Sequence, residues 1–389
     1  MGGWSMIYWF SKYEAGWWGR LFMNKQSINF WGWYAVAMKE KFVPEKIEWW
    51  QLPLLCLLLI GVVSSLSVSS WLVAFLFMDF VTIIFLVMLS VEGASSKYGP
   101  GIISFVVHQS IASAILYFSY FLYFWTSIYY DYVNLITMVG LFWKSALPPF
   151  HGWYASIFGE VSWSSVFLLS TVLKVPPTML IGSIIIYSSW SYLWWGLCVY
   201  AMFFSSMAAA GQLSMRGFFA YSSMGNTCWM VLASVISVEI YCFFFVIYAG
   251  TLLLLMMICK KWDVKKIVNL SNMSKEDGWL IACSSLSLAG VPPFAGFMPK
   301  LFICCSAVFS GSSVMVLVVI GYLVASVIGA AIYVDVASAA ICARLFMFIC
   351  PMVFPELLVV NPRVAMVFFL SQIAVAVGGM MAEITHFYF

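Results

Sequence analysis

Long apolar segments recur along the chain from residue 52 onward, and short polar stretches separate them. Most of the segments approach or exceed the roughly 20 residues that an α-helix needs to cross the hydrocarbon core of a bilayer. The pattern predicts an all-α, polytopic membrane protein with about eleven transmembrane helices. Their expected positions are 52–70, 71–91, 101–125, 132–158, 161–190, 191–210, 217–238, 240–259, 278–309, 313–335 and 363–381.

Proline pairs fall inside several of these segments. The fourth predicted helix is broken at Pro148–Pro149, the fifth carries Pro176–Pro177, and the ninth is broken around Pro292–Pro293. A proline removes a backbone donor and clashes with the preceding turn. In lipid, such a break is tolerated only where protein or water satisfies the freed backbone groups. We therefore expect each of the three proline pairs to break its helix, and the fourth and ninth helices to be discontinuous.

A lysine accompanies each proline pair. Lys144 and Lys174 precede the first two pairs, and Lys300 follows the third. The first and third sets read K-x-x-x-P-P-F and P-P-F-x-x-x-x-x-K, an inverted order that is typical of inverted-topology repeats around a pathway at the membrane midplane. An ionisable group at bilayer depth is costly and usually marks ion or proton traffic. The alternative role is a fixed ion pair that joins helices.

Asp79 and His151 are the other candidate site residues in the predicted transmembrane helices. Asp79 is the acid placed deepest in any predicted helix, so it is the expected counter-charge for a lysine. Burial disfavours the charged form of a lysine and a nearby acid favours it, so a lysine under both influences can change its protonation near neutral pH. His151 directly follows the first helix break, where a relay role and a structural role are both open.

Composition and charge are those of an integral membrane protein. Of 389 residues, 64% are hydrophobic and 8% are charged, whereas soluble chains carry about 25% charged residues. The net charge of +3, without a basic run interleaved with aromatic residues, speaks against a nucleic-acid partner. Residues 1–50 hold ten of the 33 charges and are expected to be an N-terminal extension at the interface or on the inner side. Residues 51–389 are expected to form the transmembrane domain.

The basic residues also predict an orientation. Of the 18 Lys and Arg, the three membrane lysines are set aside, which leaves 15. All of these fall in, or at the edge of, segments on one side of the membrane if eleven helices cross it. Positive charge collects on the cytoplasmic or equivalent side. The N-terminus is therefore expected on that inner side.

No segment signals a bound cofactor or metal. The ten cysteines include no C-x-x-C pair, the three histidines are far apart, and neither GxGxxG nor a P-loop is present. Iron–sulfur clusters and structural zinc need grouped ligands, and nucleotide sites use glycine-rich turns. We expect this chain to work without a redox cofactor of its own.

Three motifs, in this order, carry a family resemblance: FWKSALPPFHGW, MRGFFAYSSMGNTCWM and LAGVPPFAGFMPKLF, at 142–153, 215–230 and 288–302. Together they resemble the subunit 2 family of NADH dehydrogenase, antiporter-like membrane subunits of respiratory complex I, over roughly residues 52–385. The sequence departs from the family at Asp79, where a glutamate is usual, and at Asn226, where a histidine is usual.

The resemblance implies a proton-translocating subunit of NADH:ubiquinone reductase with an antiporter-like fold. Asp79 takes the place of the family glutamate that pairs with Lys144, Lys174 takes the central relay position, and Lys300 the terminal one. NADH, FMN, iron–sulfur clusters and ubiquinone would bind to other subunits. The implied setting is the mitochondrial inner membrane, with the N-terminus on the matrix side.

The implied partners are other membrane-arm subunits of complex I, including further antiporter-like subunits, and membrane lipids such as cardiolipin. Two alternative functions stay open at this point. The chain could be a subunit of a multi-subunit cation/proton antiporter, which the same motifs resemble. It could also be a structural spacer of the membrane arm that no longer pumps.

Overall fold

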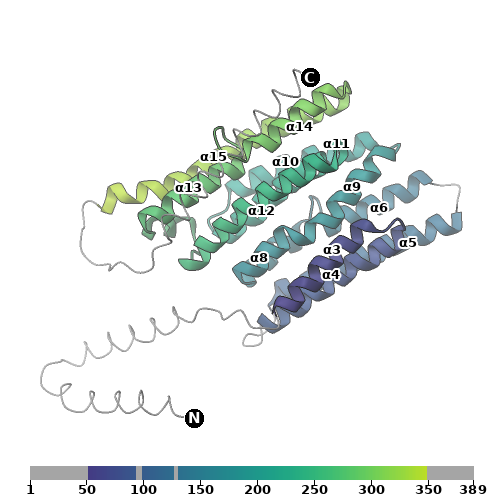
Figure 1. The fold of residues 1–389 in the computed structure, drawn as a ribbon, viewed down its shortest axis with the longest axis horizontal. Coiled ribbons are helices and arrows are strands. Elements are labelled where there is room, and N and C mark those ends of the chain that lie inside the picture. Colours follow the sequence, from purple (N-terminus) through teal and green to yellow (C-terminus); the bar gives the residue numbers. More distant parts are fainter. Residues whose placement is uncertain (1–50, 93–98, 127–129, 348–389) are drawn as a thin grey trace, which may run out of the picture. The chain divides into compact units, whose positions relative to one another are not determined.

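The computed structural model describes residues 51–92, 99–126 and 130–347. The chain divides into two units, residues 1–55 and 56–389, and the account below concerns the described part of the second unit together with the start of its first helix. Every regular element in the described ranges is a helix, and these ranges contain no β-strand (Figure 1). The predicted all-α class is confirmed for them.

The helices follow the predicted order. Up to the first proline pair they are α3 (Gln51–Ser67), α4 (Trp71–Glu92), α5 (Pro100–Thr126) and α6 (Tyr130–Lys144). The central ones are α7 (Gly152–Glu160), α8 (Trp163–Ser170), the 3₁₀ turn η1 (Val172–Lys174), α9 (Val175–Tyr187), α10 (Ser191–Ala210), α11 (Met215–Ile236) and α12 (Val238–Lys261). The last are the 3₁₀ turn η2 (Ile267–Asn272), α13 (Lys275–Ala289), α14 (Phe297–Phe309) and α15 (Ser313–Met347).

Six helical stretches in the described part of the chain are long and apolar enough to cross a membrane. They are Trp71–Glu92, Pro100–Trp125, Trp163–Ile186, Ser191–Ala210, Val238–Lys261 and Ser313–Ile341. Two shorter apolar helices, Leu52–Ser67 and Phe297–Phe309, add to them. The predicted helix 363–381 lies outside the described residues.

Local sequence sets several of the helix ends. Ser162, Ser214, Ser237 and Ser274 precede α8, α11, α12 and α13, and each side chain accepts a hydrogen bond from the backbone N–H three residues on. Such serines satisfy donors that the first turn leaves unpaired. Gly290 ends α13 with a left-handed φ of 78°, a conformation that glycine adopts without steric cost.

The two predicted discontinuous helices are present. Pro148–Pro149 lies between α6 and α7, and Pro292–Pro293 lies between α13 and α14. The third pair behaves differently, because Pro176 and Pro177 lie in the first turn of α9 and the interruption is the 3₁₀ turn before them. Prolines fit the first turn of a helix, where the missing N–H would have no intrahelical partner. The interpretation of this pair as a helix break is corrected: it begins a helix.

α15 is longer than the apolar pattern predicted. We expected the helix to end at residue 335, but it continues to Met347. Residues 337–343 include four alanines and neither glycine nor proline, so nothing in this stretch stops a helix.

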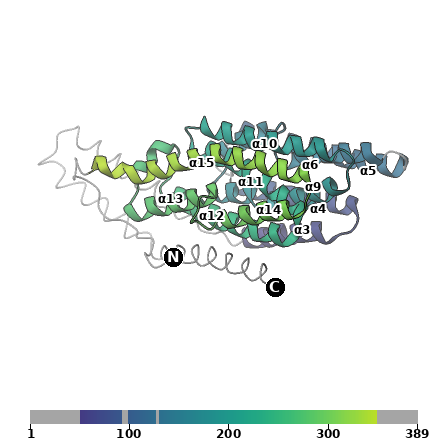
Figure 2. The same ribbon diagram turned by 90° about the horizontal axis from the view of Figure 1, so that it is seen from above.

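Within residues 56–389 the helices run alongside one another, and α11 lies in the core (Figure 2). α11 packs against α7, α9, α10, α12 and α14. Its residues 223–233 are all buried, as expected for a helix surrounded by other helices.

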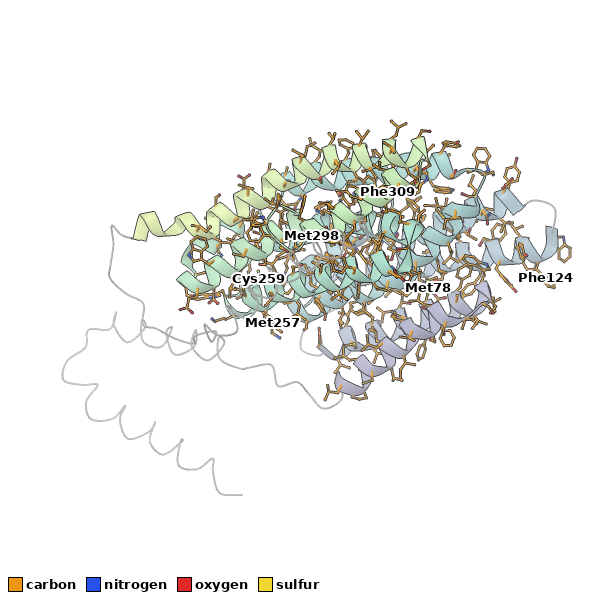
Figure 3. All side chains as sticks on the ribbon, turned by 45° about the horizontal axis from the view of Figure 1, so that its top comes forward. Met78, Phe124, Met257, Cys259, Met298 and Phe309 are labelled. Atoms are coloured by element: carbon orange, nitrogen blue, oxygen red, sulfur yellow. The ribbon has the colours of Figure 1, made fainter. Side chains whose placement is uncertain are left out.

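Large apolar side chains cover much of the outside of the helices (Figure 3). Phe124 and Phe309 are 79% and 70% exposed, whereas Met78 and Met298 are buried. So much exposed apolar surface is unusual for a soluble protein and is typical of a surface that faces lipid or other membrane subunits.

Candidate functional site

An ion pair between α4 and α6 forms the first polar cluster. Lys144 Nζ contacts Asp79 Oδ1, and the two side chains are 4% and 21% exposed. Asp79 also accepts hydrogen bonds from Ser113 at 2.5 Å and Tyr117 at 2.6 Å, and Lys144 donates to Ser113 at 3.2 Å. The aspartate therefore reaches Lys144 directly, although it is shorter than the expected glutamate. Buried charges need such pairing, so this cluster can hold both side chains in their charged forms.

Lys174 forms the second cluster, at the end of η1. Its Nζ donates to Thr227 Oγ1 at 2.8 Å and to Ser223 Oγ at 3.3 Å, and it lies 4.3 Å from the centroid of the Tyr154 ring. No carboxylate forms an ion pair with it among the residues that the structure describes. Hydroxyl groups both donate and accept, so they can hydrogen-bond a lysine in either protonation state.

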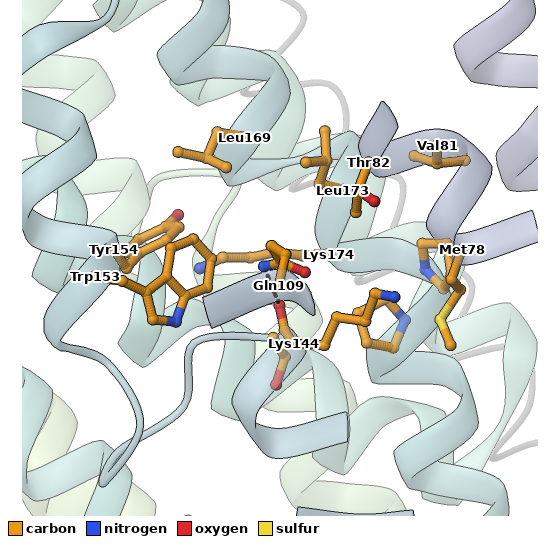
Figure 4. A pocket seen from close by; sticks show the side chains of 13 residues that line it. Met78, Val81, Thr82, Gln109, Lys144, Trp153, Tyr154, Leu169, Leu173 and Lys174 are labelled. Atoms are coloured by element: carbon orange, nitrogen blue, oxygen red, sulfur yellow. Dashed lines mark hydrogen bonds between the residues drawn. The ribbon is translucent and has the colours of Figure 1, made fainter. Parts of the chain in front are cut away.

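A small cavity of about 20 Å³ lies between these two clusters (Figure 4). Both Lys144 and Lys174 line it. The rest of the wall comes from α4, α5, α7, α8, η1 and the start of α9; its residues include Met78, Val81, Thr82, Gln109, Trp153, Tyr154, Leu169 and Leu173. The structure thus brings two of the three predicted lysines to the wall of one cavity.

Lys300 forms the third cluster, in the first turns of α14. Its Nζ donates to the backbone oxygens of Ala289 at 2.8 Å and Leu288 at 3.3 Å. These residues end α13, where the last carbonyls have no intrahelical partner and the helix dipole favours a cation. The Trp229 ring centroid lies 5.8 Å from the same nitrogen.

Lys300 also lines a second cavity, of about 40 Å³, between α10, α11, α13, α14 and α15. Ser222 and Asn226 of α11 line this cavity, whereas Ser223 and Thr227 of the same helix bond Lys174. Successive residues of a helix are 100° apart, so the two pairs occupy adjoining faces. α11 therefore presents polar groups both to Lys174 and to the cavity that contains Lys300.

His151 is placed beside aromatic rings. Its ring centroid lies 4.4 Å from that of Phe204 and 6.3 Å from that of Tyr221, and its buried Nδ1 has no hydrogen-bond partner among the described residues. His151 lines neither of the two cavities. The structure does not bring it to the lysine clusters, although its neighbour Tyr221 lines the second cavity.

Charged side chains hold helix ends together near the end of α7. Glu160 accepts hydrogen bonds from the backbone N–H of Gly101 at 2.8 Å and of Ile102 at 3.2 Å, which begin α5. Arg216 at the start of α11 donates to the Gly159 carbonyl at 2.8 Å. The second half of the first discontinuous helix is thus fixed to two neighbouring helices.

Sequence reasoning did not identify the neutral partners of the lysines. On α5, Ser113 bonds both Lys144 and Asp79, and Tyr117 bonds Asp79; on α11, Ser223 and Thr227 bond Lys174. Each pair is spaced four residues apart within an apolar helix. Residues four apart lie on one face of a helix. A polar row of this period in a membrane helix is the signal that could have found them.

Comparisons with known proteins come from sequence and from structure. A family model described as NADH:quinone oxidoreductase/Mrp antiporter, TM matches residues 68–329. The NADH-ubiquinone oxidoreductase chain 2 of Anopheles gambiae is 27% identical over 254 residues, which cover 63% of this chain and 73% of that protein.

Two solved structures share the fold. A chain of respiratory complex I from Thermus thermophilus has a TM-score of 0.66 at 20% identity, over 83% of this chain and 75% of that one. A chain of the membrane-bound sulfane sulfur reductase, an archaeal respiratory membrane complex, has a TM-score of 0.70 at 18% identity, over 87% and 75%. The antiporter-like membrane fold is therefore supported independently of the sequence motifs.

Proposed function

The chain belongs to the NADH:quinone oxidoreductase/Mrp antiporter transmembrane family, and on this premise we propose that it is a proton-translocating membrane subunit of NADH:ubiquinone oxidoreductase, complex I. Proton translocation is the general function of the family. The observation that carries the proposal is the cavity that Lys144 and Lys174 share, with Asp79 paired to Lys144 at its edge. Lys144 can lose its contact with Asp79, and Lys174 lies close enough to respond to the resulting change in charge by binding or releasing a proton.

The proposed mechanism uses the three clusters in sequence. Separation of Asp79 from Lys144 changes the electrostatic potential at Lys174, because the charge of the pair is no longer balanced locally. Lys174 then binds or releases a proton, and Lys300 does so in turn across α11. Each lysine nitrogen donates hydrogen bonds to oxygen atoms of the protein, so a positive charge can exist at each position without water from the bulk.

The wider setting completes the proposal. Redox chemistry takes place on other subunits that carry NADH, FMN, iron–sulfur clusters and ubiquinone, and this chain has no cofactor of its own. The chain lies in the mitochondrial inner membrane among other membrane-arm and antiporter-like subunits, with lipids such as cardiolipin around it. The proposal assigns residues 1–50, which lie outside the described residues, to a matrix-side or interfacial extension and residues 51–389 to the antiporter-like domain.

We also propose how the chain crosses the membrane. Eleven helices cross the membrane, two of them discontinuous, and the segments around Lys144 and Lys300 are related as inverted repeats. The opposite order of lysine and proline pair in the two segments supports this relation. The inner position of the basic residues supports an N-terminus in the matrix.

The test replaces single lysines in the assembled complex. Lys144→Ala and Lys300→Ala are each expected to lower the number of protons moved per NADH oxidised, measured in sealed vesicles. Lys265→Ala is the control, because Lys265 lies in an exposed loop where it pairs with Asp263 at 3.6 Å. A normal proton-to-electron ratio and normal electron transfer in both membrane-lysine variants would rule out the relay.

The family description also names Mrp antiporters, which keeps a cation/proton antiporter as a second candidate. Purification of the native assembly separates the two functions. Flavin and iron–sulfur subunits that co-purify with this chain support complex I, whereas an assembly without redox centres supports an antiporter. A structural spacer predicts normal assembly and no change in proton stoichiometry in any of the lysine variants.

A further inference from the structure

Glu92, the last residue of α4, connects this helix to the start of α8. Its Oε2 accepts hydrogen bonds from Ser162 Oγ at 2.8 Å and from Ser165 Oγ. Ser162 directly precedes α8, and Ser165 lies in the first turn of that helix, where it is 1% exposed. Hydrogen bonds to a carboxylate are stronger than those between neutral groups, and negative charge is favourable at the start of a helix. Glu92 therefore fixes the start of α8 to the end of α4.

The two connected helices lead to different lysine clusters. α4 carries Asp79, which contacts Lys144 and lies about 20 Å from Glu92 along the helix axis. α8 is followed by η1, which ends at Lys174. Between these points α4 and α8 both line the first cavity, so they do not pack tightly against each other there. The contact at Glu92 therefore determines how a displacement of one helix affects the other.

The segment that carries Lys174 has few backbone bonds to α9. Lys174 ends a 3₁₀ turn, and Pro176 and Pro177 follow it in the first turn of α9. Prolines have no N–H, so they cannot bond the carbonyls of the preceding turn. The partners of Lys174 are Ser223 and Thr227, and they belong to α11, which other helices surround. A displacement of α8 can therefore move Lys174 relative to its partners without moving α9 or α11.

We propose that Glu92 is a positioning residue that couples the Asp79–Lys144 pair to Lys174. When the pair separates, the displacement of α4 passes through Glu92 to α8 and moves Lys174 relative to Thr227. The inference rests on the proposed function, since it names the contact that transmits the first step of that function. Within the described residues, Glu92 forms no ion pair with any of the three membrane lysines. It acts on Lys174 through α8 and not directly.

The experiment removes this contact from each side in the assembled complex. Ser165→Ala removes one hydrogen bond and should slow proton-coupled turnover about fivefold, the factor that the loss of about one hydrogen bond gives. Glu92→Met removes both bonds and should slow turnover about twentyfold. NADH oxidation by an artificial electron acceptor should stay normal in both variants. Normal proton-coupled turnover in both variants would contradict the proposal.

Glu92→Gln separates the contact from the charge. The amide oxygen of glutamine still accepts hydrogen bonds from the two serines, so turnover should fall much less than in Glu92→Met, by about threefold. An equal loss in Glu92→Gln and Glu92→Met would assign the effect to the charge of Glu92 and would also contradict the proposal.

Ser170→Ala is the matched control within the same helix. Ser170 is buried like Ser165, but its hydroxyl donates to the Phe167 carbonyl of α8 itself at 3.0 Å. The substitution and the burial are the same, and the contact with α4 differs. Proton-coupled turnover should stay normal in this variant. An equal loss in Ser165→Ala and Ser170→Ala would show that the packing of α8 is responsible and would overturn the proposal.

A structure of the assembled Glu92→Met complex separates positioning from stability. Lys174 Nζ is expected to leave its position 2.8 Å from Thr227 Oγ1, while the contact of Asp79 with Lys144 persists. A lower thermal midpoint, with Lys174 in place and normal proton translocation, would make Glu92 a structural residue only and overturn the proposal.

Lys144→Ala distinguishes a failure of this inference from a failure of the proposed function. If that variant loses proton translocation while Glu92→Met and Ser165→Ala translocate protons normally, only the coupling through Glu92 is wrong. If Lys144→Ala itself translocates protons normally, the proposed function fails.

Discussion

The break between α6 and α7 and the break between α13 and α14 each carry a lysine, but the two lysines have different partners. Lys144 is the last residue of α6 and contacts the carboxylate of Asp79 on another helix. Lys300 lies in α14 and reaches back across the break to the last carbonyls of α13. The first break therefore stabilises its lysine with a charge, and the second does so with the backbone that the break itself frees.

The charged form of Lys144 therefore depends on another ionisable group, Asp79, whereas that of Lys300 does not. A carboxylate can be protonated or moved away, so the environment of Lys144 can change greatly while the fold persists. Backbone carbonyls keep their partial charge and move only with the helix that carries them. Lys174 lies between these cases, since its partners are hydroxyl groups. Substitutions in the three sets of partners should therefore have effects of different size on the stability of the complex and on proton translocation.

Loss of the ion pair should have the largest effect. Asp79→Asn leaves Lys144 without a counter-charge, and removing one partner of a buried pair costs about 3 kcal/mol or more. Lys144→Met should cost less, about 2 kcal/mol, because the Asp79 carboxylate that it leaves behind keeps hydrogen bonds from Ser113 and Tyr117. The thermal midpoint of the assembled complex measures both effects.

The double variant tests whether the two side chains act as a pair. Asp79→Asn combined with Lys144→Met should be less destabilising than the sum of the single changes, because no unpaired charge remains. Strict additivity, or a larger loss in Lys144→Met than in Asp79→Asn, would show that the contact does not govern the stability of this break.

At the second break, Gly290→Ala should have the next largest effect, about 2 kcal/mol. A Cβ at Gly290 would lie 2.9 Å from Lys300 Nζ, and the residue has a φ of +78°. The lysine would have to leave the α13 carbonyls, so proton translocation should fall together with the thermal midpoint.

Gly311→Ala is the matched control for that change. Gly311 has a similar φ of +66°, but no atom lies within 4 Å of an added Cβ. Only the backbone cost remains, about 1 kcal/mol, and proton translocation should stay normal. If both variants lose the same amount of stability and both pump normally, Lys300 does not need the carbonyl site.

The comparison also shows what the sequence can predict. The helix positions followed from the length of the apolar segments, and the lysines were visible because a charge stands out in such a segment. Asp79 could be predicted as the counter-charge of a lysine because few acids lie inside the predicted helices, and the family resemblance assigned it to Lys144.

The remaining partners could not be predicted for physical reasons. The carbonyls that hold Lys300 belong to Leu288 and Ala289, and a backbone oxygen carries no side-chain signal. Many serines and threonines occur in the apolar helices, and the rotation of α11 decides that Ser223 and Thr227 face Lys174. Pro176 was misread because the same residue type breaks a helix in its interior and begins one in its first turn.

Lys174 gives a smaller and more selective effect. Thr227→Val keeps the shape of the side chain but removes the hydroxyl 2.8 Å from Lys174 Nζ. A hydrogen bond to a charged group contributes about 1.5 kcal/mol or more, so proton-coupled turnover should fall about tenfold. Thr251→Val is the control, because buried Thr251 donates to backbone oxygens of its own helix, at 2.9 Å to Ile247. An equal loss in both variants would show that general packing, and not Lys174, is responsible.

The smallest effect is expected at the end of α7, where Glu160 fixes the first discontinuous helix to the start of α5. Glu160→Gln removes the charge from a group that accepts two backbone N–H bonds, from Gly101 at 2.8 Å and Ile102 at 3.2 Å. Loss of a cap of this type costs about 1 kcal/mol, and less at an exposed position. Glu276→Gln, in the exposed first turn of α13, is the matched control.

A lower thermal midpoint with unchanged proton stoichiometry in Glu160→Gln would show that this contact fixes α7 without taking part in the relay. A fall in stoichiometry confined to Glu160→Gln would mean that the position of α7, which carries Trp153 and Tyr154 into the cavity, controls proton transfer at the first break.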